Sequence, residues 1–176
     1  IAYAGLTLMT TIIGFSFIFL KFALRHASPV DLLAHRFTAA TLALLLYYAL
    51  LERRVPRYEK SSIFSLLALS LFYPILLFSL QTIGLQFTTA SEAGIMSATA
   101  PILTVILAAL VLKEKNNVWQ NFSVALSVGG VIYIMYKNGL GEVSAETLKG
   151  DFFILLSVMS VAFYFVLVLT VRRIVF

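Results

Sequence analysis

The chain has 176 residues, of which 61% are hydrophobic and 12% are charged, and it contains no cysteine. Soluble domains have roughly 45–50% apolar and 25% charged residues, so this composition excludes an ordinary water-soluble domain and indicates a membrane protein. The lack of cysteine excludes disulfides and thiol chemistry. The net charge of +5 does not indicate nucleic-acid binding, because the basic residues lie between apolar runs.

Apolar runs follow one another along the chain, each near the ~20 residues that a helix needs to cross a bilayer. Because lipid offers the backbone no hydrogen bonds, each run is expected to be helical. The predicted fold class is an all-α polytopic membrane protein with six transmembrane helices. The six spans are expected at residues 1–24, 29–51, 61–85, 91–112, 118–136 and 151–171.

Two of these helices begin with recognisable capping residues. The second opens with Ser28, Pro29 and Asp31, which are typical of an N-cap, a first-turn proline and an acid near the positive end of the helix dipole. Thr89 precedes the fourth, and Glu92 follows three residues later, as in a capping box. We therefore interpret Asp31 and Glu92 as helix caps rather than as substrate or proton sites.

The basic residues predict an orientation. The positive-inside rule favours a cytoplasmic N-terminus, with eight basic residues inside and four outside. The inner set is Arg53, Arg54, Arg57, Lys60, Lys113, Lys115, Arg172 and Arg173, and the outer set is Lys21, Arg25, Lys137 and Lys149. We expect Lys21 to extend toward the outer interface. The expected location is the cell (inner) membrane.

The last span resembles the first. When the chain is aligned with itself at an offset of 148 residues, Gly-Phe-Ser-Phe at 14–17 aligns with Ala-Phe-Tyr-Phe at 162–165, and Arg25 aligns with Arg173. A repeat of five helices places its second copy upside down in the membrane. We therefore predict a first five-helix repeat at 1–138, and a loop with the first helix of a truncated second repeat at 139–176.

Several short motifs, in a fixed order, carry a resemblance to a known family. They are Ala27-Ser28-Pro29 with Arg36, Phe87-Thr88-Thr89-Ala90-Ser91-Glu92-Ala93, Ala100-Pro101, Leu112-Lys113-Glu114, Gln120, Gly129-Gly130-Val131 and Gly150-Asp151. This pattern resembles the EamA-type, ten-helix branch of the drug/metabolite transporter superfamily. The resemblance implies a transporter of small metabolites, often an exporter of amino acids or related compounds, with two inverted repeats around a central cavity.

Pro74 and Pro101 lie near the middles of two predicted helices. A proline deprives the carbonyl four residues earlier of its helical donor, here at Ser70 and Ser97. Irregular backbone at that depth is tolerated where it is buried in protein or faces water. We predict that both prolines are hinges beside a midplane cavity that works by alternating access. Static kinks satisfied by hydroxyls or neighbouring helices are the alternative.

Polar side chains within the spans mark candidate cavity faces. Tyr73, Gln81, Ser97 and Tyr164 are predicted to line the substrate cavity, although a serine at such a position also serves as a small packing contact. Arg36 lies about two turns into its span, where an unpaired arginine costs at least ~2.5 kcal/mol. It is predicted either to bind a substrate carboxylate or to anchor the helix by pairing with Asp31 or freed carbonyls.

Competing functions find less support in the residues. Protease chemistry needs a nucleophile beside a base or paired interior acids, and the spans offer neither, so we expect no enzyme. No metal or other cofactor is expected, since neither histidine has a second ligand at suitable spacing. The alternatives left open are a non-transporting scaffold or assembly subunit, and a cation or multidrug exporter whose acid lies in missing helices. The expected partners are a small substrate and the lipid bilayer, and a homodimer is left open.

Overall fold

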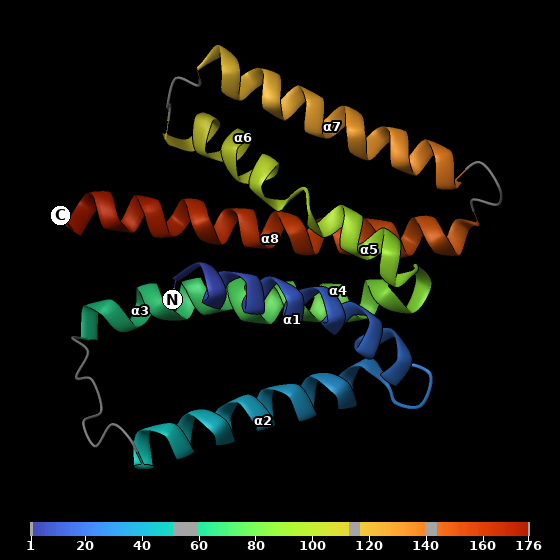
Figure 1. The fold of residues 1–176 in the computed structure, drawn as a ribbon. Helices are drawn as coiled ribbons and strands as arrows, with labels where there is room; N and C mark the ends of the chain where they lie inside the picture. The colour runs from blue at the N-terminus through green and yellow to red at the C-terminus, as the bar shows by residue number, and fades with distance from the viewer. Residues whose placement is uncertain (1, 51–59, 113–116, 140–143, 176) are drawn as a thin grey trace.

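The structure is a computed structural model that describes residues 2–50, 60–112, 117–139 and 144–175, and its regular elements there are all helical (Figure 1). The elements are α1 (Ala2–Ala23), α2 (Pro29–Leu50), α3 (Lys60–Ser70), the π-helical segment η1 (Leu71–Leu76), α4 (Leu77–Phe87), α5 (Ala90–Ser97), α6 (Ala100–Leu112), α7 (Val118–Gly139) and α8 (Ala145–Val175).

These elements form six helical rods. The segments α3, η1 and α4 follow one another without a break, and only Ala98 and Thr99 separate α5 from α6. Five rods are long and apolar enough to cross a membrane: Tyr3–Ala23, Pro29–Leu50, Leu66–Phe87, Ala90–Leu112 and Ala145–Thr170. The remaining rod, α7, is a helix of 22 residues. The predicted all-α polytopic membrane fold is confirmed.

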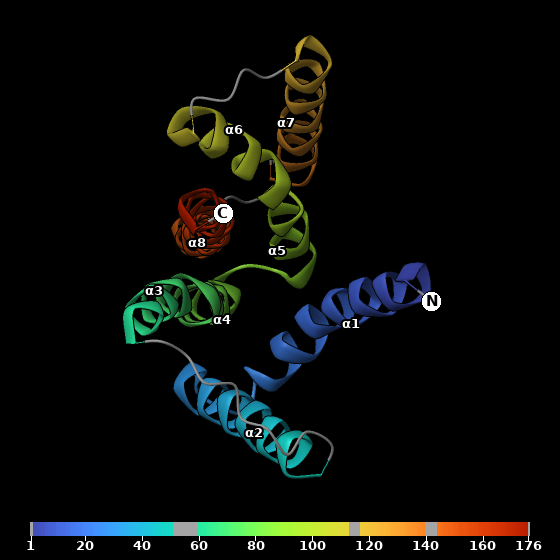
Figure 2. The same ribbon diagram turned by 90° about the vertical axis from the view of Figure 1, so that its left-hand side faces the viewer.

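Helix α8 is the central element of the bundle (Figure 2). It contacts α3, η1, α4, α5 and α6, whereas α1, α2 and α7 lie further out. A third of its apolar window, 33%, is buried, against at most 6% in each of the other four spans. Ile154 and Val158 of α8 meet Leu85, Ala93 and Met96 in the core. The helix that we assign to a second repeat is thus the one on which α3, η1, α4, α5 and α6 pack.

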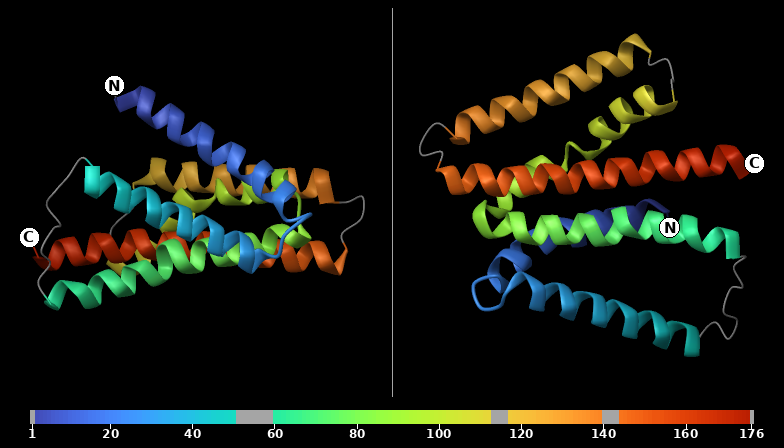
Figure 3. Two further views of the ribbon diagram at one scale, coloured as in Figure 1. Left: turned by 90° about the horizontal axis from the view of Figure 1, so that it is seen from below. Right: turned by 180° about the vertical axis from the view of Figure 1, so that it is seen from behind.

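The rods alternate in direction. The start of α2, the end of α4 and the start of α8 lie at one end of the bundle (Figure 3). Helices α1 and α8 run in opposite directions (Figure 1). An inverted repeat requires this arrangement, but any chain of six alternating helices also produces it, so the inverted repeat stays a prediction.

The sixth helix begins earlier than predicted. It starts at Ala145 rather than Asp151, so the expected boundary was wrong by six residues. Ser144 explains the difference, because its Oγ accepts a hydrogen bond from the Thr147 amide at 3.2 Å and Glu146 lies in the first turn. Both are features of a helix N-terminus.

The third rod is interrupted where Pro74 was expected to bend it. Tyr73 has φ −139° and ψ 111°, the extended backbone favoured for a residue that precedes proline. Ser160 of α8 donates a hydrogen bond from its Oγ to the Phe72 carbonyl at 2.7 Å. A hydroxyl from a neighbouring helix therefore satisfies the Phe72 carbonyl beside the kink, which is the kind of contact that the static-kink alternative for Pro74 involves.

Replacing Ser160 with alanine should destabilise the protein, because the Phe72 carbonyl would lose this donor. We expect a loss of about 1 kcal/mol, measured by thermal unfolding of the full-length protein in detergent. Ser157→Ala is the matched control, since the buried Ser157 hydroxyl donates only to Ile154 of its own helix. Equal losses in the two variants would contradict an interhelical role for Ser160.

The fourth rod breaks before its proline. Helix α5 ends at Ser97 and α6 starts at Ala100, so Pro101 lies in the first turn of a new helix, where a proline is well tolerated. Within the single span Ala90–Leu112, the interruption therefore lies at Ala98 and Thr99, just before Pro101. The Ala98 amide still donates to the Gly94 and Ile95 carbonyls, which continues the hydrogen bonding of α5 into the break.

Several residues used to predict the orientation lie outside the described residues: Arg53, Arg54, Arg57, Lys113 and Lys115. Glu114, part of one family motif, also lies outside them. The orientation therefore stays a prediction.

Candidate functional site

The two capping predictions are confirmed. The Thr89 Oγ1 accepts from the Glu92 amide at 3.1 Å, and the Thr89 amide donates to the Glu92 carboxylate at 3.1 Å, which completes a capping box. The Asp31 amide donates to Ser28 Oγ at 3.2 Å, and the Ser28 hydroxyl donates to the Asp31 carboxylate at 2.7 Å. Both acids are therefore engaged locally at helix starts.

Thr88 joins three elements where α4 meets α5 and α8. The residue is only 2% exposed, and its Oγ1 lies 2.8 Å from Glu92 Oε2 and 2.8 Å from Asp151 Oδ1. Thr88 was not singled out from the sequence, because a threonine beside a capping box carries no signal of a contact 63 residues away.

Lys21 of α1, which was expected to extend toward the outer interface, reaches the carbonyls at the end of α4. Its Nζ donates to the carbonyls of Leu85 at 2.7 Å, Gln86 at 3.2 Å and Thr88 at 2.7 Å. Carbonyls at the end of a helix have no intrahelical donor. A cation with three N–H groups satisfies them and also favours the negative end of the helix dipole. Lys21 therefore ties α1 to the end of α4.

Three of the predicted substrate-binding residues come together. The Arg36 Cζ lies 3.8 Å from the centre of the Phe78 ring, so α2 and α4 share a cation–π contact. The Phe78 ring is 5.7 Å from that of Tyr73, which in turn lies 5.1 Å from that of Tyr164. Phe37 adds a ring 6.3 Å from Phe78. We call Arg36, Phe37, Tyr73, Phe78 and Tyr164 the aromatic cluster.

Arg36 does not pair with Asp31, which was one of the two partners considered for an anchoring role, the other being freed carbonyls. It forms no hydrogen bond or ion pair with another residue in the described part of the chain, and its contact is the Phe78 ring. Phe78 was missed, because one phenylalanine among 15 in an apolar chain gives no signal of a cation partner.

The other predicted site residues lie elsewhere. Gln81 is half-buried on α4, three residues beyond Phe78. Ser97 lies at the end of α5, and its buried Oγ has no hydrogen-bond partner among the residues that the structure describes. Pro74 lies next to Tyr73 in η1, whereas Pro101 lies in the first turn of α6.

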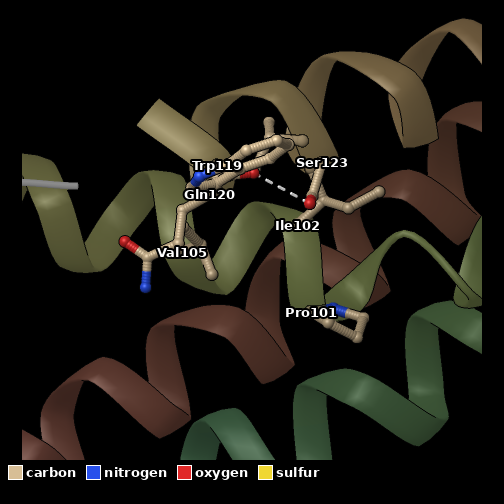
Figure 4. A pocket seen from close by; sticks show the side chains of 7 residues that line it. Pro101, Ile102, Val105, Trp119, Gln120 and Ser123 are labelled. Carbon is tan, nitrogen blue, oxygen red and sulfur yellow. Dashed lines mark hydrogen bonds between the residues drawn. The ribbon is translucent and has the colours of Figure 1, made fainter. Parts of the chain in front are cut away.

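Pro101 faces an open pocket between α6 and α7, with a volume of about 320 Å³ (Figure 4). Val105 and Ile102 form its α6 wall, and Trp119 and Ser123 belong to the α7 wall. The Ser123 hydroxyl donates to the Trp119 carbonyl at 2.9 Å, so it is already satisfied within its own helix. Pro101 borders this pocket, and the role of Pro74 and Pro101 as hinges stays a prediction.

A bundle of long apolar helices, with polar and cationic groups held between them, defines a polytopic membrane protein. The described residues contain no group of three or more histidines, cysteines or acids that could hold a metal ion. The chain matches the EamA-like transporter family over residues 1–136 and belongs to that family. This is a family of membrane transporters, within the drug/metabolite transporter superfamily, rather than a family of enzymes.

Curated relatives agree with this assignment. The chain is 44% identical to "Uncharacterized transporter YcxC" of Bacillus subtilis (strain 168) over 167 residues, which are 93% of this chain and 52% of that protein. It is 31% identical to "Uncharacterized transporter YetK" of the same organism, over 93% of this chain and 50% of the relative. An "Uncharacterized transporter" of Archaeoglobus fulgidus is 31% identical over 77% of this chain and 46% of its own length. The chain thus spans about half the length of these relatives, and no solved structure matches it significantly.

Proposed function

We propose that the full-length protein carries small metabolites, namely amino acids or related compounds, out of the cell by alternating access around a midplane cavity. In this proposal residues 1–138 are the first repeat, the chain from 139 onward begins an inverted second repeat, and the N-terminus is cytoplasmic. Arg36, Tyr73, Gln81, Ser97 and Tyr164 contribute to the substrate path. The single observation that carries it is the convergence of Arg36, Tyr73 and Tyr164 in one cluster.

The broken helix beside this cluster supports the proposal. Transporters of the inverted-repeat type bind substrate near the midplane, at helices whose backbone is interrupted. Tyr73 is both the interrupted residue of the third rod and a member of the aromatic cluster. A tyrosine held this way presents its ring to α8, the first helix of the proposed second repeat.

Reconstitution of the full-length protein into liposomes tests the proposal. We expect efflux of at least one compound from a panel of amino acids and small organic acids, above the rate of empty vesicles. No flux of any compound would favour a scaffold or assembly role instead. Proton-linked efflux of organic cations alone would favour the cation or multidrug exporter.

Replacing Pro101 with alanine should slow this transport severalfold, because the added N–H allows α5 and α6 to fuse into one stiffer rod. Initial rates in liposomes at equal protein content measure the effect. Ile102→Ala is the control, since it changes the same pocket wall without changing a backbone donor. An unchanged rate in a well-inserted Pro101→Ala variant would remove the hinge role.

A further inference from the structure

Arg36 has a charged group whose N–H donors form no hydrogen bond with any residue that the structure describes. It lies inside the membrane-spanning segment Pro29–Leu50, and its guanidinium covers the Phe78 ring at 3.8 Å. Stacking satisfies the face of a guanidinium but leaves the N–H groups at its edge free for other partners. Arg36 is half-buried, and a charge within a membrane-spanning segment is costly unless it is paired or reaches water, so the edge of Arg36 is suited to a polar partner from outside the described residues.

Three acids of the described residues have partners elsewhere. Asp31, on the same helix, is bonded to Ser28. Glu92 is held by its capping box with Thr89, and the Thr88 hydroxyl lies 2.8 Å from both Glu92 and Asp151 at the end of α4. No carboxylate of the described residues forms an ion pair with Arg36. The planar edge of a guanidinium matches a carboxylate in a two-bond arrangement, which makes a ligand carboxylate the chemically suited partner.

The surroundings of Arg36 indicate the rest of the ligand. Tyr73 and Tyr164 have ring centres 5.1 Å apart and ring planes tilted by 33°, and Tyr73 remains 38% exposed. Phe78 connects this pair to the cation. Flat aromatic faces beside a cation suit a ligand whose charged end is followed by an apolar, flat body.

We propose that the aromatic cluster binds a small organic anion, with its carboxylate on Arg36 and an aromatic or other flat apolar body against Tyr73 and Tyr164. This inference rests on the proposed function, because it names the substrate class of the same site. It narrows that class to molecules in which the carboxylate, rather than an amino group, is the essential feature.

Calorimetric titration of the full-length protein in lipid nanodiscs tests the inference with 3-phenylpropionate and its neutral amide, 3-phenylpropanamide. We expect the wild-type protein to bind the carboxylate about tenfold or more tightly than the amide, the ratio that one charge-assisted hydrogen-bond pair supplies. This comparison needs no variant and does not depend on how a substitution affects folding. Equal affinities for the two probes would overturn the proposal.

Variants then locate the preference. Arg36→Gln should bind both probes equally weakly, and Arg36→Lys should retain part of the preference, because lysine keeps the charge but loses the planar edge. Tyr164→Leu should weaken the binding of 3-phenylpropionate, while the preference for 3-phenylpropionate over its amide persists. Arg25→Gln is the control, since Arg25 is exposed and outside the aromatic cluster. An Arg36→Gln protein that still prefers the carboxylate would assign the anion to a different site.

Liposome flux separates this inference from the proposed function. If the protein moves compounds of the panel but 3-phenylpropionate neither binds nor competes with their transport, the proposed carboxylate site is contradicted and the carrier function stands. If 3-phenylpropionate binds in an Arg36-dependent manner but no compound crosses the membrane, the site stands and the carrier function is wrong.

Discussion

Replacing Gly150 with alanine is expected to destabilise the protein strongly, because the backbones of α4 and α8 touch at this residue. A Cβ on Gly150 would lie 2.8 Å from the Thr88 amide nitrogen, 2.9 Å from the Gly84 carbonyl oxygen and 2.9 Å from the Phe87 carbonyl carbon. These are backbone atoms, which cannot rotate away as a side chain can. The two helices would have to separate, at a cost of about 3 kcal/mol.

The measurement is the thermal unfolding of the full-length variant in detergent, together with its yield from membranes. Gly84→Ala should behave in the same way, since its Cβ would meet the Gly150 carbonyl oxygen at 2.8 Å. Gly94→Ala is the matched control, because a Cβ there meets nothing within 4 Å and alanine is about 1 kcal/mol better than glycine in a helix. A Gly150→Ala protein as stable as Gly94→Ala would show that α4 and α8 do not approach this closely.

The membrane fold was predictable because its cause is local. A run of apolar residues of membrane-spanning length must be a helix wherever it lies, so composition and run length identified the helical rods. The Ser28 and Thr89 caps were predictable for the same reason, since their partners are three residues away. The start of α8 was missed although Ser144 and Glu146 carried a similar signal, because the apolar run itself begins only after Asp151.

The contacts between helices were much harder to predict, because apolar helices carry almost no pattern that selects neighbours. Arg36 and Tyr164 were singled out as rare polar groups in lipid, and the structure places both in the aromatic cluster. Nothing in the sequence pointed to Phe78 between them. Ser97 was chosen by the same reasoning and lies at the end of α5 without a hydrogen-bond partner among the described residues, so polarity identified candidates but could not group them.

Replacing Lys21 with methionine should also have a large effect, because it removes three hydrogen bonds from one ammonium group. The carbonyls of Leu85, Gln86 and Thr88 would be left without that donor at the end of α4. Methionine keeps the length and the apolar stem, so the loss reports the charge and its donors. We expect a destabilisation of about 3 kcal/mol, since hydrogen bonds to charged groups contribute roughly 1.5–3 kcal/mol each and water replaces part of them.

Lys149→Met provides the matched control at the same junction, since the Lys149 Nζ lies 5.1 Å from the Phe87 ring and its side chain is exposed. Loss of the Lys149 ammonium group should destabilise the protein by less than about 1 kcal/mol. Hydrogen exchange should show where the difference arises: the amides of the α4–α5 turn should exchange faster in Lys21→Met but not in Lys149→Met. Because Thr88 in that turn also bonds to Asp151, loosening the turn should spread to the first turns of α8. Unchanged exchange there would mean that α1 packs beside α4 without holding its end.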